Sequence, residues 1–265
     1  MSGPGVREPA VAGTFYPAGP DELRSTVQGL LERAGNVAGP PPKALVVPHA
    51  GYMYSGPVAA SAYARVVPMR GRVERVVVLG PAHRLALDAI AAPGADALAT
   101  PLGTVPVDTA ARDRLVDAGT IVVSDEAHAR EHSLEVQLPF LQVALGDVRV
   151  LPLAVGRVPA SAVADVLDAV WGGEETLIVV STDLSHYHDH ATATELDRRT
   201  AATVVAREVE ALEPGNACGV FPLRGLLAAA RRHRLDVELL DLRTSGDTSG
   251  PRDRVVGYGA FALVE

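Results

Sequence analysis

The fold depends most on one stretch of the sequence, Val46-Val47-Pro48-His49-Ala50-Gly51-Tyr52-Met53-Tyr54-Ser55-Gly56. A largely apolar run over residues 43–47 stops there at a proline and a histidine, and the chain then turns through glycines toward a helix start. In an open α/β sheet, ligands bind outside the carboxyl ends of the parallel strands. The pattern therefore predicts a buried strand that delivers His49 to a binding site.

The same pattern occurs twice more along the chain. Residues 75–79 form an apolar run that ends in Gly80-Pro81-Ala82-His83. Residues 176–180 form another, and it ends in Ser181-Thr182-Asp183-Leu184-Ser185-His186. Because the carboxyl ends of parallel strands share one edge of a sheet, we expect the three histidines to lie along one rim.

The order of the predicted elements indicates the fold class. Amphipathic helical segments alternate with apolar strands, which favours a mostly parallel central sheet flanked by helices on both faces. Residues 237–242 and 255–263 read as two closing strands joined by a polar, turn-rich loop over 243–250. Residues 85–108 mix glycine and proline with short apolar runs that indicate short strands. We expect a single α/β domain over residues 1–265.

Composition and charge exclude several classes of function. The chain has 265 residues, 48% of them hydrophobic, and 24 basic against 32 acidic side chains give a net charge of −8. This balance argues against a nucleic-acid partner. We expect a cytoplasmic protein without a membrane partner, since residues 1–7 lack the apolar core of a signal peptide and no apolar run is long enough to span a bilayer. The sequence leaves a homo-oligomer open.

Short motifs narrow the chemistry further. The chain contains no GxGxxG, Walker A or GxSxG motif. The sequence therefore gives no support to a nucleotide-binding or serine-hydrolase function. The single cysteine, Cys218, excludes an intrachain disulfide and fits a reducing compartment. We interpret it as a buried, inert thiol.

The histidines at the strand ends predict a metal site. His49 and His83 are 83 − 49 = 34 residues apart, which is about one strand, helix and strand. Two neutral imidazoles and one carboxylate suit non-haem Fe(II), and Zn or Cu accept the same ligands. Asp183 or Asp247 would supply the carboxylate from another strand end.

Further polar residues are candidates for the surroundings of this metal. His186 is the expected general acid/base, because an imidazole titrates near neutral pH. His132 and Glu135 occur in Glu131-His132-Ser133-Leu134-Glu135, where acids at a helix start also have a plain structural explanation. For these two residues the catalytic and the structural interpretation stay open, whereas His128 is interpreted as structural.

Six motifs together resemble those of a known family. The set resembles the Memo family, whose bacterial and archaeal members are called AmmeMemoRadiSam system protein B, and the resemblance runs from about residue 7 to the C-terminus. The motifs in chain order are Ala12-Gly13-Thr14-Phe15-Tyr16-Pro17, Pro48-His49-Ala50-Gly51-Tyr52, Gly80-Pro81-Ala82-His83, Glu131-His132-Ser133-Leu134-Glu135, Ser181-Thr182-Asp183-Leu184-Ser185-His186 and Val256-Gly257-Tyr258-Gly259-Ala260.

The resemblance implies a fold similar to the class III, LigB-like extradiol dioxygenases, which hold Fe(II) with two histidines and a carboxylate and open catechol rings with O₂. It implies that His49 and His83 are metal ligands and that His186 is the acid/base histidine. Animal members carry a cysteine in the loop before the last strand, where this chain has Ser245-Gly246-Asp247-Thr248. Asp247 would then restore the carboxylate ligand.

The expected function is a metal-dependent oxidoreductase of the non-haem dioxygenase type, acting with O₂ on a small, catechol-like substrate. Fe(II) is the first choice of metal, with Cu or Zn as alternatives. Tyr52, Asp183, His132 and Glu135 are expected to line the pocket. Two alternatives stay open: a non-catalytic binding or scaffold protein, and a zinc-dependent hydrolase. Arg84 is the one arginine expected near the rim, which argues against a groove that reads phosphate groups.

Overall fold

A computed structural model of the chain describes residues 5–35 and 38–265. The expectations that concern residues 1–4, at the start of the chain, lie outside the described residues. Within the described residues, no helix combines the length and the apolar character needed to cross a bilayer.

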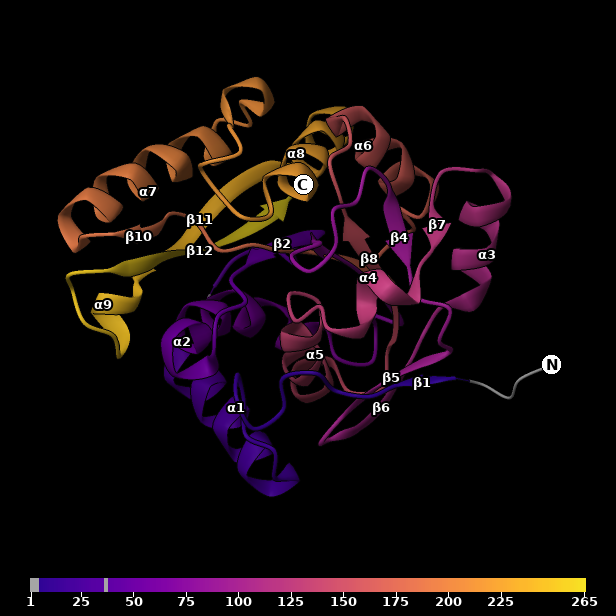
Figure 1. Ribbon diagram of the computed structural model, residues 1–265, viewed down its shortest axis with the longest axis horizontal. Helices are drawn as coiled ribbons and strands as arrows, with labels where there is room; N and C mark the ends of the chain where they lie inside the picture. The colour runs from indigo at the N-terminus through magenta and orange to yellow at the C-terminus, as the bar shows by residue number, and fades with distance from the viewer. Residues whose placement is uncertain (1–4, 36–37) are drawn as a thin grey trace.

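A large mixed sheet forms the centre of the molecule (Figure 1). Among the described residues it has nine strands in the order β10-β12-β2-β9-β3-β8-β4-β7, with β11 also paired to β12. The run β2-β9-β3-β8 is parallel, whereas β12 pairs antiparallel with β2 and β4 pairs antiparallel with β8. The strands are β2 (Ala44–Val47), β3 (Arg75–Pro81), β4 (Ile90–Ala92), β7 (Val122–Val123), β8 (Arg149–Val155), β9 (Thr176–Ser181), β10 (His186–His188), β11 (Asp236–Thr244) and β12 (Val255–Val264).

Helices cover both faces of this sheet, as Figure 1 shows with α1, α2 and α5 below it and α6 and α8 above it. The longer helices are α1 (Pro20–Ala34), α2 (Tyr52–Tyr63), α3 (Thr109–Asp117), α5 (Leu138–Leu145), α6 (Ala160–Ala169), α7 (His190–Val205) and α8 (Val220–His233). Short helical turns are η1 (Ala64–Met69), α4 (Asp125–Ala129), η2 (Glu135–Gln137), η3 (Val209–Ala211) and α9 (Ser245–Thr248). The expected α/β class is therefore confirmed.

The central strands form because their side chains are apolar on both faces. In β2, Leu45 and Val47 pack into the core between the sheet and α1, α2 and α5. Ala44 and Val46 pack into the core on the opposite face, between the sheet and α6 and α8. This two-residue alternation is the geometry of a pleated strand. Continuous apolar runs of this kind are typical of parallel strands that are buried on both sides.

Two regions differ from the sequence expectation. Residues 85–108 form the expected short strands, β4 and β6 (Gly103–Pro106), but β6 pairs with β5 (Ala97–Thr100) in a separate small sheet that also contains β1 (Val6–Arg7). In the loop expected over 243–250, residues 245–248 instead form α9, whose start is capped reciprocally by Thr244 and Asp247. Both differences depend on contacts that a local apolar pattern does not encode.

The strand register brings the candidate site residues to one edge. Val47 of β2 lies beside Ser181 of β9, and Val180 of β9 lies beside Leu79 of β3. The segments that follow these three strands therefore leave the sheet side by side. The antiparallel strand β12 meets β2 only from Phe261 onward, so its first residues extend beyond this edge and form a wall.

Candidate metal centre

His49 follows β2 directly and is held rigidly by its neighbours. Its side chain is buried, and its backbone N–H donates to Oδ1 of Asp183 at 2.7 Å. Its ring Nδ1 lies 2.9 Å from Oγ of Ser181 at the end of β9. Burial, with a further contribution from nearby His83, lowers the pKa of His49 to about 3, so the imidazole is neutral at physiological pH.

The hydrogen bonds of Ser181 determine which nitrogen of His49 is free. The Ser181 hydroxyl donates its one proton to the carbonyl of Ser133 at 2.6 Å, and its oxygen accepts a bond from Nε2 of Gln137. The Ser181 oxygen can therefore only accept from His49, which assigns the ring proton to Nδ1. The lone pair of His49 lies on Nε2 and is available to a metal.

His83 follows β3 and is held by a buried carboxylate. Its Nδ1 lies 2.9 Å from Oε1 of Glu131, and its backbone N–H donates to Oε2 of the same residue at 2.6 Å. Oε1 also accepts the backbone N–H groups of His132 and Ser133. Burial opposes ionisation of Glu131, but the bonds from His83 and from backbone amides prevail and lower its pKa to about 2. The ionised carboxylate accepts only, so His83 also keeps its lone pair on Nε2.

His132 completes a three-histidine cluster. One ring nitrogen from each of His49, His83 and His132 lies within 4.8 Å of the other two. The ring of His132 stacks on that of His83 and meets that of His49 edge-on, with centroids 4.9 and 5.4 Å apart. Burial first, then His49, lowers the pKa of His132 to about 4. Its Nδ1 is buried and has no hydrogen-bond partner among the described residues.

The donor set fits a divalent transition metal. Three imidazoles in mutual reach suit Zn, Cu or Fe, and Nδ1 of His132 is a buried polar atom without a hydrogen-bond partner among the described residues. The carboxylate of Glu131 behind His83 is the outer partner that metal-bound histidines usually have.

The cluster lies in a cavity of about 710 Å³ at the carboxyl edge of the sheet. This volume lies within the range of small-molecule sites. His186, Asp183 and Cys218 also line it. His186 Nδ1 lies 2.8 Å from the carbonyl of Leu184, which can only accept, so the other ring nitrogen of His186 is free.

Cys218 is closer to the histidines than its sequence context suggested. Its sulfur lies 3.3 Å from Nε2 of His49 and accepts the backbone N–H of Asp183 at 3.2 Å. Burial, followed by the nearby Asp183, raises the pKa of the thiol to about 12. Burial likewise raises the pKa of Asp183. The raised pKa favours the protonated thiol, which is partly exposed and lines the cavity.

The sequence model of the family described as "Memo-like protein" matches residues 7–262. The chain belongs to the Memo family. Three relatives show this over nearly the whole chain. MEMO1 family proteins of Methanopyrus kandleri, Methanosarcina barkeri and Aquifex aeolicus are each 37% identical to it. The matches cover 97%, 97% and 96% of this chain and 98%, 100% and 97% of the relatives. The resemblance drawn from the motifs is confirmed.

A solved structure shares the fold of this Memo chain. The crystal structure of an uncharacterized protein from Escherichia coli K12 has a TM-score of 0.56 at 16% identity, and the match covers 84% of this chain and 99% of that one. At this identity the likeness concerns the fold alone.

Three expected site residues of this Memo chain lie outside the cavity. Tyr52 is buried and donates to the carbonyl of Val136. Glu135 is buried, pairs with Arg7 and accepts the hydroxyl of Tyr16 and two backbone N–H groups, so it fastens the N-terminal arm. Asp247 caps α9 and lies 2.6 Å from a ring nitrogen of His190. Its carboxylate is therefore occupied away from the histidine cluster, and the third side chain within reach of His49 and His83 is His132.

Sequence reasoning missed two functional residues. Glu131 was interpreted as an acid that stabilises a helix start, but its carboxylate orients His83. Ser181 was treated as the end of a strand, but its hydroxyl fixes the tautomer of His49. The adjacency of Glu131 to His132 was the available signal for the first, and the sequence offered none for the second.

Proposed function

We propose that this Memo chain is a metal-dependent oxidoreductase of the non-haem dioxygenase type that acts on a small, catechol-like substrate. One observation carries the proposal. His49 and His83 are fixed as tautomers that leave Nε2 free, and a nitrogen of His132 lies within reach of both. Ring opening of a catechol by O₂ places both oxygen atoms in the product, so the reaction requires no external reductant.

The metal would be held by His49, His83 and His132. When bound, a redox-active metal would supply Lewis acidity and open coordination positions at which O₂ and the substrate meet. Fe(II) is our first choice, and Cu would fit the same imidazoles. The residues of the chain do the remaining work. Ser181 and Glu131 hold the imidazoles of His49 and His83 in fixed orientations through their Nδ1 atoms.

His186 would act as the general acid/base. Its Nδ1 proton is held by the carbonyl of Leu184, so the free nitrogen is the one that can take a proton from a substrate hydroxyl and return it to the product. His186 lines the same cavity as the three histidines without belonging to their cluster. This separation is what an acid/base residue beside a metal requires.

A zinc-dependent hydrolase is the second candidate, and the donor set itself favours it. Three histidines with an open fourth position form the ligand set of a hydrolytic or hydrating zinc site. In that case the metal would lower the pKa of a bound water, and His186 would transfer the proton.

Metal titration of protein purified without oxygen tests the proposal. His132→Ala should lose Fe(II) binding by at least about tenfold, since one of three ligands is removed, whereas Asp247→Asn should bind as the wild type does. If only Asp247→Asn loses metal binding, the third ligand is Asp247 in the loop before β12 and not His132. A wild-type chain that takes up no Fe(II), Cu or Zn would instead support the scaffold alternative. Oxygen uptake with a panel of catechols then separates dioxygenase from hydrolase.

A further inference from the structure

The mouth of the cavity carries positive charge although the protein as a whole is acidic. Arg84 and Arg254 both line the cavity, in a chain of net charge −8. Neither forms an ion pair with a carboxylate among the described residues. Asp183 is the one carboxylate that lines the cavity, and it is buried and accepts the backbone N–H of His49. The net field at the mouth therefore favours an anion.

The two arginines face the cavity from different sides. Arg84 follows β3, and Arg254 directly precedes β12. In the sheet, β2 and β9 lie between these two strands. Both side chains line the cavity that contains the histidine cluster.

The backbone beside Arg254 is shaped to present an aromatic side chain. β10 and β12 pair with a register shift between His186 and His188, and Tyr187 at this irregularity has a φ of 66°. A left-handed conformation is uncommon for a bulky residue, and such bulges often re-aim a side chain next to an active site. Tyr187 is 64% exposed, lines the cavity, and has the Arg254 guanidinium 4.5 Å from its ring centroid.

This stacking prepares Arg254 for a planar anion. A guanidinium held against an aromatic ring keeps its N–H groups directed along its own plane, where a carboxylate binds with two parallel hydrogen bonds. The walls of the cavity add further rings from Phe15, Tyr54 and Tyr258. A flat aromatic body with one acidic group matches both features.

We propose that the substrate is a small aromatic carboxylate, whose acid group binds Arg254 and Arg84 while its ring extends over the three histidines. The inference rests on the proposed function, because it names the substrate class of the same site. Arg254, supported by Tyr187, carries most of the discrimination, and Arg84 adds to it from the opposite side.

Calorimetric titration of the Zn(II)-loaded protein tests this without any turnover. The two probes are 3,4-dihydroxybenzoate and catechol, which share the ring hydroxyls and differ in the carboxylate. We expect the wild type to bind 3,4-dihydroxybenzoate about tenfold more tightly, because a charge-assisted hydrogen bond at a partly exposed site has about this effect. Raised salt should reduce the preference.

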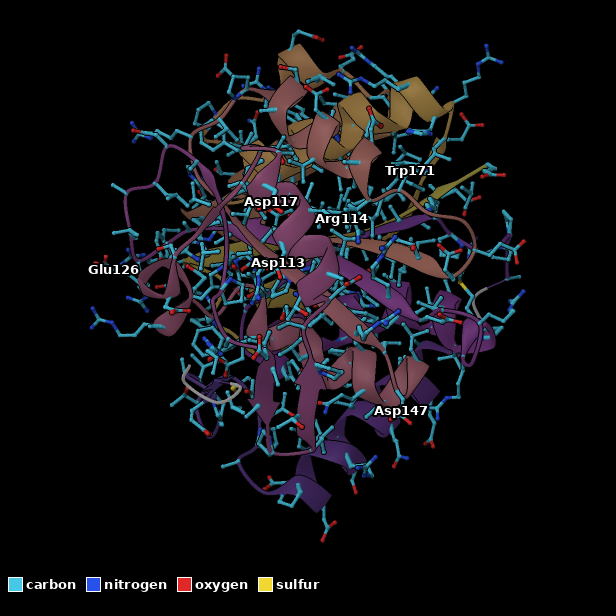
Figure 2. The ribbon with its side chains drawn as sticks, turned by 90° about the vertical axis from the view of Figure 1, so that its right-hand side faces the viewer. Asp113, Arg114, Asp117, Glu126, Asp147 and Trp171 are labelled. Atoms are coloured by element: carbon cyan, nitrogen blue, oxygen red, sulfur yellow. The ribbon has the colours of Figure 1, made fainter. Side chains whose placement is uncertain are left out.

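Substitutions of the two arginines show which of them causes the preference for 3,4-dihydroxybenzoate over catechol. Arg254→Gln should remove most of it and Arg84→Gln part of it, with catechol binding unchanged in both. Arg114→Gln is the matched control, since Arg114 projects from α3 on the side of the molecule shown in Figure 2 and does not line the cavity. Equal affinity of the wild type for both probes, or a preference that survives in Arg254→Gln, overturns the inference while the metal site stands. Binding of neither probe removes the proposed function as well.

Discussion

Replacement of Glu131 by glutamine gives the most direct test of how the site is held. The carboxylate is 1% exposed and accepts four hydrogen bonds. Three of them reach Oε1, from Nδ1 of His83 and the N–H groups of His132 and Ser133, and the fourth reaches Oε2 from the N–H of His83. Glutamine has one oxygen, so its best orientation keeps the three bonds at Oε1 and turns its NH₂ group toward the N–H of His83.

The cost follows from this count. One buried donor loses its acceptor, which costs about 1–3 kcal/mol, and the three bonds that remain are no longer charge-assisted. We expect Glu131→Gln to lower the free energy of unfolding by about 3 kcal/mol in total. Because the ring of His83 loses its charged partner, we also expect metal affinity to fall about 10- to 100-fold.

Two measurements on the same variant separate these effects. Urea denaturation of the metal-free protein reports the stability, and competition with a chromophoric chelator reports the affinity for Zn(II). Glu126→Gln is the matched control, because Glu126 is exposed on α4 (Figure 2) and should change neither quantity measurably. A variant that loses stability but binds Zn(II) as tightly as the wild type would refute the reasoning, since Glu131 would then be structural and His83 would not depend on it.

Two further predictions concern the scaffold. Gly225→Ala in α8 should destabilise the protein by up to about 2 kcal/mol in urea denaturation, because a Cβ there would lie 2.2 Å from Cβ of Val163 in α6, and overpacking of about 1–3 kcal/mol opposes a helix-propensity gain of about 1 kcal/mol. Gly29→Ala in α1, where only a flexible side chain is near, should be neutral or stabilising, and equal effects at both positions would contradict the packing argument. Burial lowers the pKa of His128 to about 4, below the 6.5 of an unperturbed histidine, so the unfolded state binds the proton first and stability is lost as the pH falls below about 6.5. The stability difference between wild type and His128→Gln should therefore shrink by about 2 kcal/mol between pH 7 and pH 5, and a pH-independent difference would show that His128 protonates freely in the folded state.

The parts of the fold that were predictable from sequence are those whose apolar pattern is continuous. β2, β3 and β9 are buried on both faces over their apolar runs, so the expected strands over 43–47, 75–79 and 176–180 overlap most of Ala44–Val47, Arg75–Pro81 and Thr176–Ser181. In contrast, β1 has two residues and pairs with β5 more than 90 positions away, which no local pattern specifies.

The same distinction holds at the site. His49 and His83 were predictable neighbours because each follows a central strand, and parallel strands place their carboxyl ends together. His132 follows no such strand. It is brought in by the turn after α4, where the carboxylate of Glu131 accepts hydrogen bonds from the backbone N–H groups of His83, His132 and Ser133. Tertiary contacts of this kind determine where a loop histidine lies, and they are absent from any sequence period.

Asp247 shows that a local signal can also outrank an analogy. The resemblance to dioxygenases predicted a carboxylate ligand, and Asp247 was the residue chosen for it in the loop before β12. The segment Thr244-Ser245-Gly246-Asp247, however, also has the spacing of a capping box, in which the first and fourth residues bond each other's backbone N–H groups. The structure forms this box, with Oδ2 of Asp247 2.9 Å from the N–H of Thr244. A carboxylate that caps a helix has its lone pairs committed, so the spacing of Thr244 and Asp247 alone was a reason to seek the third ligand among the remaining histidines.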